Sequence, residues 1–278
     1  MDFLQAVVLG LVEGVTEYLP VSSTGHLLLA QRLMGIPSST AADAFAICIQ
    51  AGAILAVLGL YRARVGQMLL GLTGKSPEGL RLLLNLATAF APAAVIGLLL
   101  EKHIKKYLFG GGQWDLWPVV AAWFVGGVAI LAVSFWRRQR GKSPRAGLDL
   151  NHLTLSMALV VGTAQCLAMW PGVSRSLITI VGGVMVGLSL PAAVELSFLL
   201  GLITLTAATA KDALDHGAEM LSTYGIAPLA AGFGAAWISA VVAVSWMVGY
   251  LRNHGMGIFG WYRVLLALAV ATWLLWLK

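Results

Sequence analysis

The stretch Glu13-Gly-Val-Thr-Glu17-Tyr-Leu-Pro20-Val-Ser-Ser-Thr-Gly-His26 divides an apolar N-terminal segment into two short pieces, residues 3–19 and 22–34. The ring of Pro20 disfavours helical backbone at Leu19, so a first helix is expected to stop there and a second to follow. Each piece falls short of the roughly 20 residues that a helix needs to cross a bilayer. The pattern therefore predicts a re-entrant helix–turn–helix, which enters and leaves the membrane from one face.

The composition around this unit is that of an integral membrane protein. Of the 278 residues, 59% are hydrophobic and only 11% are charged, whereas soluble domains carry about 25% charged residues. The mean hydropathy is +0.86. Six apolar stretches have about the length of a transmembrane helix: 43–61, 82–100, 116–136, 192–210, 226–250 and 259–277.

Charged residues gather between these stretches. Residues 62–81 and 137–145 are rich in Lys and Arg, and residues 211–219 carry three acidic side chains. Cytoplasmic loops are enriched in basic residues, so we assign the first two segments to the cytoplasm and expect no nucleic-acid partner. The third is predicted to be a loop on the outside.

A second broken unit lies in the C-terminal half. Ala6-Val-Val-Leu-Gly10-Leu-Val-Glu13 matches Ala158-Leu-Val-Val-Gly162-Thr-Ala-Gln165, and a helix breaker and a hydroxyl cluster follow both. In the second unit these are Pro171-Gly-Val-Ser174-Arg-Ser176. Interrupted apolar segments at matching places in two halves indicate a site near the bilayer midplane.

These observations predict an all-α, polytopic membrane protein with an inverted-topology repeat. Three spans follow each broken unit, and this odd number inverts the second half relative to the first. We predict one membrane domain, 1–278, with two re-entrant helix hairpins and about six transmembrane helices. It consists of a half-repeat at 1–136, a cytoplasmic loop at 137–152 and an inverted half-repeat at 153–278.

Two carboxylates stand in the first broken unit. Glu13 and Glu17 are four residues apart, so they share one face of a helix. A charged side chain at the centre of a span costs roughly 2.5–3.5 kcal/mol on insertion scales. Two of them require a cation, a proton or a polar cavity, and we predict a divalent-cation site or a catalytic role. The alternative is that one of them is a protonated packing residue.

Hydroxyl groups and an imidazole follow at the start of the second helix. Ser22, Ser23 and Thr24 suit a helix N-terminus, whose free N–H groups and positive dipole favour phosphate. His26 lies within one helical turn of Ser23 and is expected to act in proton transfer. The alternative is that the hydroxyls are only caps and His26 is a packed histidine.

Arg175 lies in an apolar stretch of the second unit. Its guanidinium needs an anion there and matches phosphate oxygens in a bidentate manner. The alternative is a structural salt bridge to Glu13 or Glu17. Polar neighbours supply further donors and acceptors for a substrate: Gln165, Ser174, Ser176 and Thr179.

Together these groups predict phosphoryl transfer. Glu17, Ser23, His26 and Arg175 are the candidate catalytic residues, and the order of the residues does not decide whether Ser23 or His26 attacks phosphorus. Ser22 and Thr24 join the polar neighbours of Arg175 as candidate substrate-binding groups.

At these residues the chain resembles the undecaprenyl pyrophosphate phosphatase family of the bacitracin-resistance type. The matching stretches are Glu13 to His26, Ile49-Gln50 with Gly52, Gln165 to Thr179, and Ser197-Phe-Leu-Leu200. Leu177-Ile178 departs from the family, which has Gly and a small residue there, and the added bulk is expected to narrow the second turn.

The resemblance implies a multi-pass enzyme of the bacterial inner membrane that hydrolyses the pyrophosphate of the C55 polyprenyl carrier to the monophosphate. That reaction recycles the carrier for cell-wall synthesis and confers bacitracin resistance. The resemblance also implies a divalent cation, Mg²⁺ or Ca²⁺, a site open to the periplasm, and a homodimer as one possible assembly. It assigns the chemistry to Glu13, Glu17, Ser23, His26 and Arg175, with Glu13 and Glu17 at the metal.

Two other functions fit part of the pattern. Many transporters have inverted repeats with broken helices, so a transporter or flippase for a phosphorylated lipid or anion is the main alternative. It would use Arg175 but has no need of Ser23 and His26. A phosphatidic-acid-phosphatase-type enzyme also contains Ser-Gly-His, but the Lys- and Arg-Pro-containing motif of that class is not evident.

Overall fold

The computed structural model describes residues 1–37, 39–108 and 116–276, with side chains for all of these except 100–108. The elements in the described residues are helices, apart from one isolated bridge between Leu148 and Leu188. In chain order they are α1 (Phe3–Thr16), α2 (Ser23–Leu33), α3 (Thr40–Leu60), α4 (Arg62–Leu72), α5 (Pro77–Leu108), α6 (Trp117–Gln139), η1 (Leu150–His152), α7 (Leu155–Gln165), η2 (Cys166–Met169), α8 (Arg175–Met185), α9 (Leu190–Tyr224), α10 (Ile226–Leu251) and α11 (Gly257–Trp276).

Six of the described helices are long and apolar enough to cross a membrane: α3, α5, α6, α9, α10 and α11. They coincide with the six predicted stretches, although residue 277 of the last stretch lies outside the described residues. The all-α, polytopic fold class is therefore confirmed, and the protein is a multi-pass membrane protein.

The predictions of loops at residues 211–219 and 62–81 are wrong, because both segments are largely helical. Residues 211–219 are helical and belong to the C-terminal part of α9, where Lys211 and Asp215 form an ion pair of 2.9 Å one turn apart. Residues 62–81 contain α4 and the start of α5. Polar side chains end the apolar stretch but not the helix, because a helix continues readily into water.

The two broken units each form a pair of short helices. In the first, α1 ends at Thr16, earlier than the predicted Leu19, and a turn leads to α2. In the second, the turn joins η2 to α8. That each pair re-enters the membrane from one face stays a prediction.

Helices from the two halves of the chain interlace. The closest helix pairs join α1 to α10, α3 to α9 and α10, α5 to α7, and α6 to α11. Small residues permit this proximity: a Cβ at Gly10 would collide with the carbonyl of Gly232, and one at Gly14 with that of Ala236. Contacts between the halves therefore form a large part of the core, together with contacts within each half such as those of α8 with α9.

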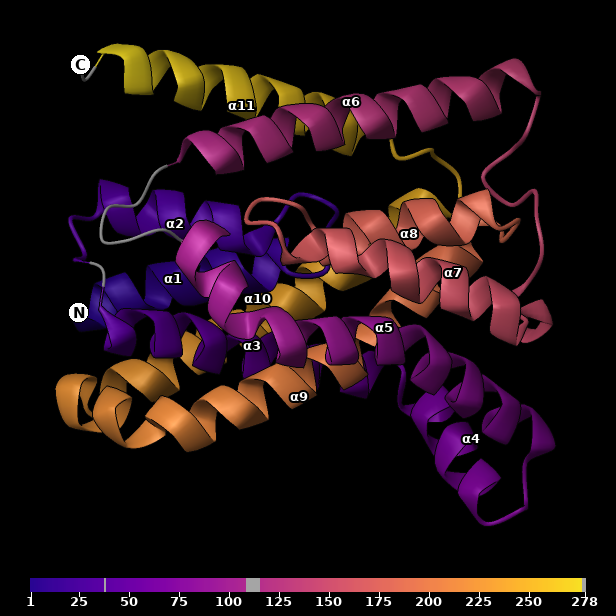
Figure 1. Ribbon diagram of the computed structural model, residues 1–278, viewed down its shortest axis with the longest axis horizontal. Helices are drawn as coiled ribbons and strands as arrows, with labels where there is room; N and C mark the ends of the chain where they lie inside the picture. Colours follow the sequence, from indigo (N-terminus) through magenta and orange to yellow (C-terminus); the bar gives the residue numbers. More distant parts are fainter. Residues whose placement is uncertain (38, 109–115, 277–278) are drawn as a thin grey trace.

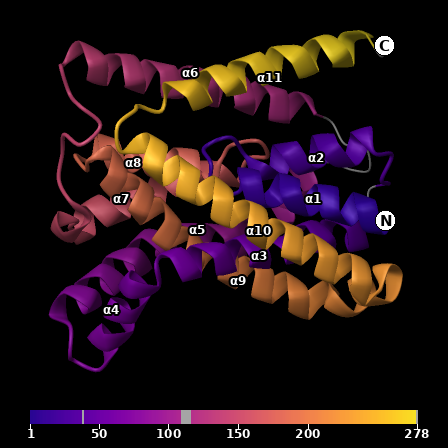
Figure 2. The same cartoon turned by 180° about the vertical axis from the view of Figure 1, so that it is seen from behind.

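Figures 1 and 2 show where the turns of the broken units lie. The two turns face each other in the middle of the molecule, with the α6–α11 pair on one side and α3 and α9 on the other. The loop after α6 and helix α4 lie at one end of the molecule, and the α9–α10 connection at the opposite end. The basic segments are therefore separated from the acidic end of α9.

Candidate active site

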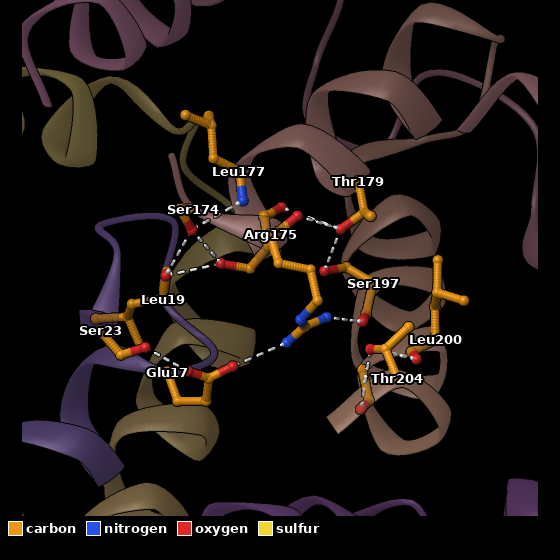
Figure 3. A network of polar contacts seen from close by, with 12 residues as sticks. Glu17, Leu19, Ser23, Ser174, Arg175, Leu177, Thr179, Ser197, Leu200 and Thr204 are labelled. Atoms are coloured by element: carbon orange, nitrogen blue, oxygen red, sulfur yellow. Dashed lines mark hydrogen bonds and ion pairs between the residues drawn. The ribbon is translucent and has the colours of Figure 1, made fainter. Parts of the chain in front are cut away.

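Serine hydroxyls hold the two turns against each other. Ser176 Oγ donates to the carbonyl of Leu19 at 2.8 Å, and Ser174 Oγ lies 3.5 Å from the same oxygen (Figure 3). Ser174 also caps α8 by accepting from the N–H of Leu177 at 3.2 Å. Ser174 and Ser176, two of the predicted substrate-binding residues, thus make contacts within the protein that join the first half to the second.

The start of α2 is strained. Ser22 has φ +76° and is the one described residue other than glycine with a positive φ. Such backbone costs about 1–3 kcal/mol and is concentrated at functional sites. The Ser22 hydroxyl caps α2 by accepting from the N–H of Gly25 at 3.4 Å. Ser23, next in the chain, is buried, whereas Thr24 is exposed.

Glu17 joins a hydroxyl from the first half to a cation from the second. Its Oε2 accepts a hydrogen bond from Ser23 Oγ, and its Oε1 lies 3.4 Å from Arg175 Nη2. Figure 3 shows the carboxylate between these two side chains. A carboxylate in this position can take the proton of the serine hydroxyl, and the guanidinium beside it is suited to a phosphate oxygen.

The guanidinium of Arg175 is positioned by a hydrogen bond to α9. Its Nη1 donates to the carbonyl of Ser197 at 2.9 Å, and its guanidinium carbon lies 5.4 Å from the centre of the Tyr18 ring. Thr179 Oγ1 supports this arrangement through Ser197 Oγ at 2.7 Å. The Nε of Arg175 is buried and has no hydrogen-bond partner among the described residues. The salt bridge to Glu17 is therefore present, and it leaves donor capacity on Arg175.

Glu13 is buried one turn before Glu17, and neither of its carboxylate oxygens has a hydrogen-bond partner among the described residues. Gln165 Oε1 is likewise buried without a partner in that part of the chain. Leaving a buried carboxylate unpaired is costly, so Glu13 needs a cation or a proton.

The two glutamates fit a divalent cation. Carboxylate oxygens are the ligands that Mg²⁺ and Ca²⁺ prefer, and Mg²⁺ commonly binds one or two carboxylates together with water and substrate phosphates. No group of three or more His, Cys, Asp or Glu in the described residues is arranged to hold a metal. Glu13 and Glu17 are the carboxylates at this site that could hold such an ion.

His26 has both ring nitrogens engaged. Nδ1 lies 2.7 Å from the carbonyl of Ser22, and Nε2 lies 2.7 Å from the hydroxyl of Tyr262. The ring stacks on Tyr262 at 5.7 Å and tilts against Trp123 at 5.1 Å. This network assigns the proton to Nδ1 and makes Nε2 the acceptor. Ser23 is hydrogen-bonded to the carboxylate and not to the imidazole.

Two residues of α11 reach the site although they are not among the residues predicted from the sequence. Tyr262 contacts His26, and Arg263 is fully buried with its guanidinium at the two turns. The signal for Arg263 was available, because it is a lone cation in an apolar stretch, as Arg175 is. Tyr262 had no such signal, since interfacial tyrosines are common in membrane helices.

Leu177 is buried and points away from the polar network (Figure 3). Its Cδ2 faces α6, where it would lie 2.9 Å from a Cβ placed on Gly126. The bulk of this side chain is therefore accommodated by a glycine of α6.

Comparisons with known proteins identify the family of the chain. The family model described as bacitracin resistance protein BacA matches residues 6–269. The undecaprenyl-diphosphatase of Sorangium cellulosum is 45% identical over 99% of this chain and 87% of its own length. Undecaprenyl-diphosphatase 2 of Rhodospirillum rubrum is 42% identical over 96% and 93%, and the undecaprenyl-diphosphatase of Methylococcus capsulatus is 42% identical over 98% and 94%. The chain therefore belongs to the BacA bacitracin resistance family.

Proposed function

We propose that this protein is an undecaprenyl-diphosphatase, which hydrolyses undecaprenyl pyrophosphate to undecaprenyl phosphate and inorganic phosphate. The family and the names of the relatives support this activity. The observation that carries it is the chain of contacts from Ser23 through Glu17 to Arg175, which joins a nucleophile, a base and a phosphate ligand. The reaction recycles the lipid carrier for peptidoglycan synthesis and confers bacitracin resistance.

Ser23 is the nucleophile in this proposal. Its Oγ forms a bond to the terminal phosphorus, the bridging P–O bond breaks, and undecaprenyl phosphate leaves while Glu17 takes the hydroxyl proton. Water then attacks the phosphoserine, the bond from phosphorus to Ser23 breaks, and the serine regains a proton. Arg175 stabilises the charge on the transferring phosphoryl oxygens in both steps.

Glu13 and Glu17 would hold a divalent cation, Mg²⁺ or Ca²⁺, which when bound neutralises charge on the pyrophosphate oxygens. The unpartnered oxygens of Glu13 support this assignment. His26 would orient the substrate or transfer a proton from its place beside Ser22, where Tyr262 fixes its ring. Gln165 would offer the substrate its buried carbonyl oxygen, which has no hydrogen-bond partner among the described residues.

We also propose which membrane contains the protein and how the protein is oriented in it. We place the protein in the bacterial inner membrane with the basic segments 62–81 and 137–145 in the cytoplasm and the site open to the periplasm. The separation of basic and acidic ends in Figure 1 supports this orientation. A homodimer is expected from the family resemblance, and light scattering of the detergent-solubilised protein tests it.

Release of inorganic phosphate from undecaprenyl pyrophosphate by the purified, detergent-solubilised protein is the direct test. Activity that disappears with chelator and returns with added Mg²⁺ or Ca²⁺ is the expected result. A transporter or flippase would bind the lipid without releasing phosphate, and that outcome would overturn the proposal. The hydrogen bond between Ser23 and Glu17 favours hydrolysis, because transport needs no activated nucleophile.

A further inference from the structure

Arg263 of α11 connects both turns of the broken units to α6. Its Nη1 donates to the carbonyl of Pro20 at 3.3 Å in the first turn, and its Nη2 donates to the carbonyl of Gly172 at 3.1 Å in the second. The same guanidinium reaches the carbonyls of Ala122 at 2.8 Å and Trp123 at 3.4 Å in α6. One side chain thus binds four backbone oxygens that belong to three separate segments.

The guanidinium is fully buried, and no carboxylate forms an ion pair with it in the part of the chain that the structure describes. Among the described residues, its charge is compensated by the dipoles of the four carbonyl groups. Room for it comes from Gly126, where a Cβ would collide with Nη2 and lie 2.9 Å from the guanidinium carbon. A buried cation is costly, so a side chain kept in this environment has to provide contacts that an apolar residue lacks.

We propose that Arg263 is a positioning residue that fixes the relative placement of the two turns, so that Ser23 and Glu17 of the first half face Arg175 of the second. This inference rests on the proposed function. Arg263 lies among backbone carbonyls and acts through the turns rather than on the substrate.

The need for this residue follows from the way in which the backbones of the two turns are otherwise attached to each other. The hydroxyls of Ser174 and Ser176 meet the first turn at a single atom, the carbonyl oxygen of Leu19. The other contacts across this junction, the Glu17–Arg175 ion pair and the Tyr18 ring beside the Arg175 guanidinium, are made by side chains rather than by the backbone of the first turn. Arg263 adds a second attachment at Pro20 and Gly172, and two attachments fix the orientation. Glu17 and Arg175, which face each other across this junction in Figure 3, then keep their separation of 3.4 Å.

An arginine suits this task because its planar fork presents five N–H donors in fixed directions. A lysine in the same place keeps the charge but has one compact ammonium, which cannot span oxygens from three segments. Arg263→Lys therefore separates the effect of geometry from the effect of charge.

The first measurement is hydrolysis of undecaprenyl pyrophosphate by the purified full-length protein, normalised to the monodisperse fraction. Arg263→Lys should lower kcat at least tenfold and change KM less than threefold, because the substrate ligands remain but their alignment is lost. Gly126→Ala, which keeps Arg263 but displaces its guanidinium, should lower kcat in the same direction. Gly234→Ala in α10 is the matched control, since a Cβ there meets nothing within 4 Å.

The second measurement does not depend on activity. With the native cysteines replaced, spin labels at Thr24 and Trp170, two exposed positions beside the turns, report the distribution of distances between them. Arg263→Lys and Gly126→Ala should broaden this distribution, and Gly234→Ala should not.

The two measurements distinguish failure of the positioning role from failure of the proposed function. An unchanged distribution in both Arg263→Lys and Gly126→Ala overturns the positioning role, as does a wild-type kcat in both. If Arg263→Lys does not yield a monodisperse protein, Gly126→Ala alone decides. Absence of phosphate release from the wild-type protein would refute the proposed function, and the distances would still show whether Arg263 orders the turns.

Discussion

Replacing Arg175 by lysine tests whether the shape of its fork matters for the reaction. In the structure Nη1 donates to Ser197 at 2.9 Å while Nη2 lies 3.4 Å from Glu17, and Nε has no partner among the described residues. An ammonium cannot keep both contacts and also offer a donor to the substrate. The loss of one charge-assisted hydrogen bond costs about 1.5–3 kcal/mol. Since about 1.4 kcal/mol corresponds to a factor of ten, kcat/KM should fall roughly 10- to 150-fold.

The assay is release of inorganic phosphate from undecaprenyl pyrophosphate in detergent, with saturating Mg²⁺, over a range of substrate concentrations. Arg64→Lys is a matched control, because Arg64 forms an ion pair of 2.6 Å with Glu195 that includes none of the candidate catalytic residues. The control should stay within about twofold of wild type, as expected for a partly exposed pair. A kcat/KM near the wild-type value in Arg175→Lys would refute the role of the fork and leave Arg175 only as a charge.

Four further predictions address the nucleophile, the imidazole, the metal and the topology. Ser23→Ala should lower kcat by at least ~100-fold with little change in KM, whereas a near-wild-type kcat would transfer the attack to His26 or to water. His26→Ala should also lower kcat, and unchanged kinetics would make it a packed histidine. Glu13→Gln should shift activation by Mg²⁺ to higher concentration, and an identical metal titration would argue against a cation at this carboxylate. Gly141→Cys and Gly217→Cys should be labelled from opposite faces of intact cells, with Gly217→Cys labelled from outside, and labelling from the same face contradicts the inverted topology.

The arrangement of helices could be predicted from the sequence to the extent that hydropathy determines it. Apolar stretches of membrane length located the six long helices, and Pro20 located the first break. The ends of helices were harder to predict, because polar residues mark where a helix leaves the membrane and not where the helix ends. Residues 211–219, which are polar and belong to α9, are an example.

The sequence singled out most of the polar residues that the structure brings together at the candidate site, but it did not predict most of the contacts between them. Glu17, Ser23 and Arg175 stood out because polar groups are rare and costly in apolar segments. The partners of His26 could not be foreseen, because its contact with Tyr262 joins residues 236 positions apart. Ser174 and Ser176 contact Leu19, which only the tertiary arrangement of the two turns makes possible, and their role toward a substrate stays a prediction.

The interlaced packing of the two halves has a consequence for biosynthesis. Glu17 is translated 158 residues before the arginine that pairs with it, and Pro20 precedes its contact Arg263 by 243 residues. At about 5–20 residues per second, the first carboxylates wait roughly 10–30 s for Arg175, and longer for Arg263. During this interval α1 also lacks its neighbour α10. A nascent chain that stops before Arg263 already carries the reactive side chains but lacks the residue that aligns them, so catalytic competence arises only after Arg263 has been synthesised.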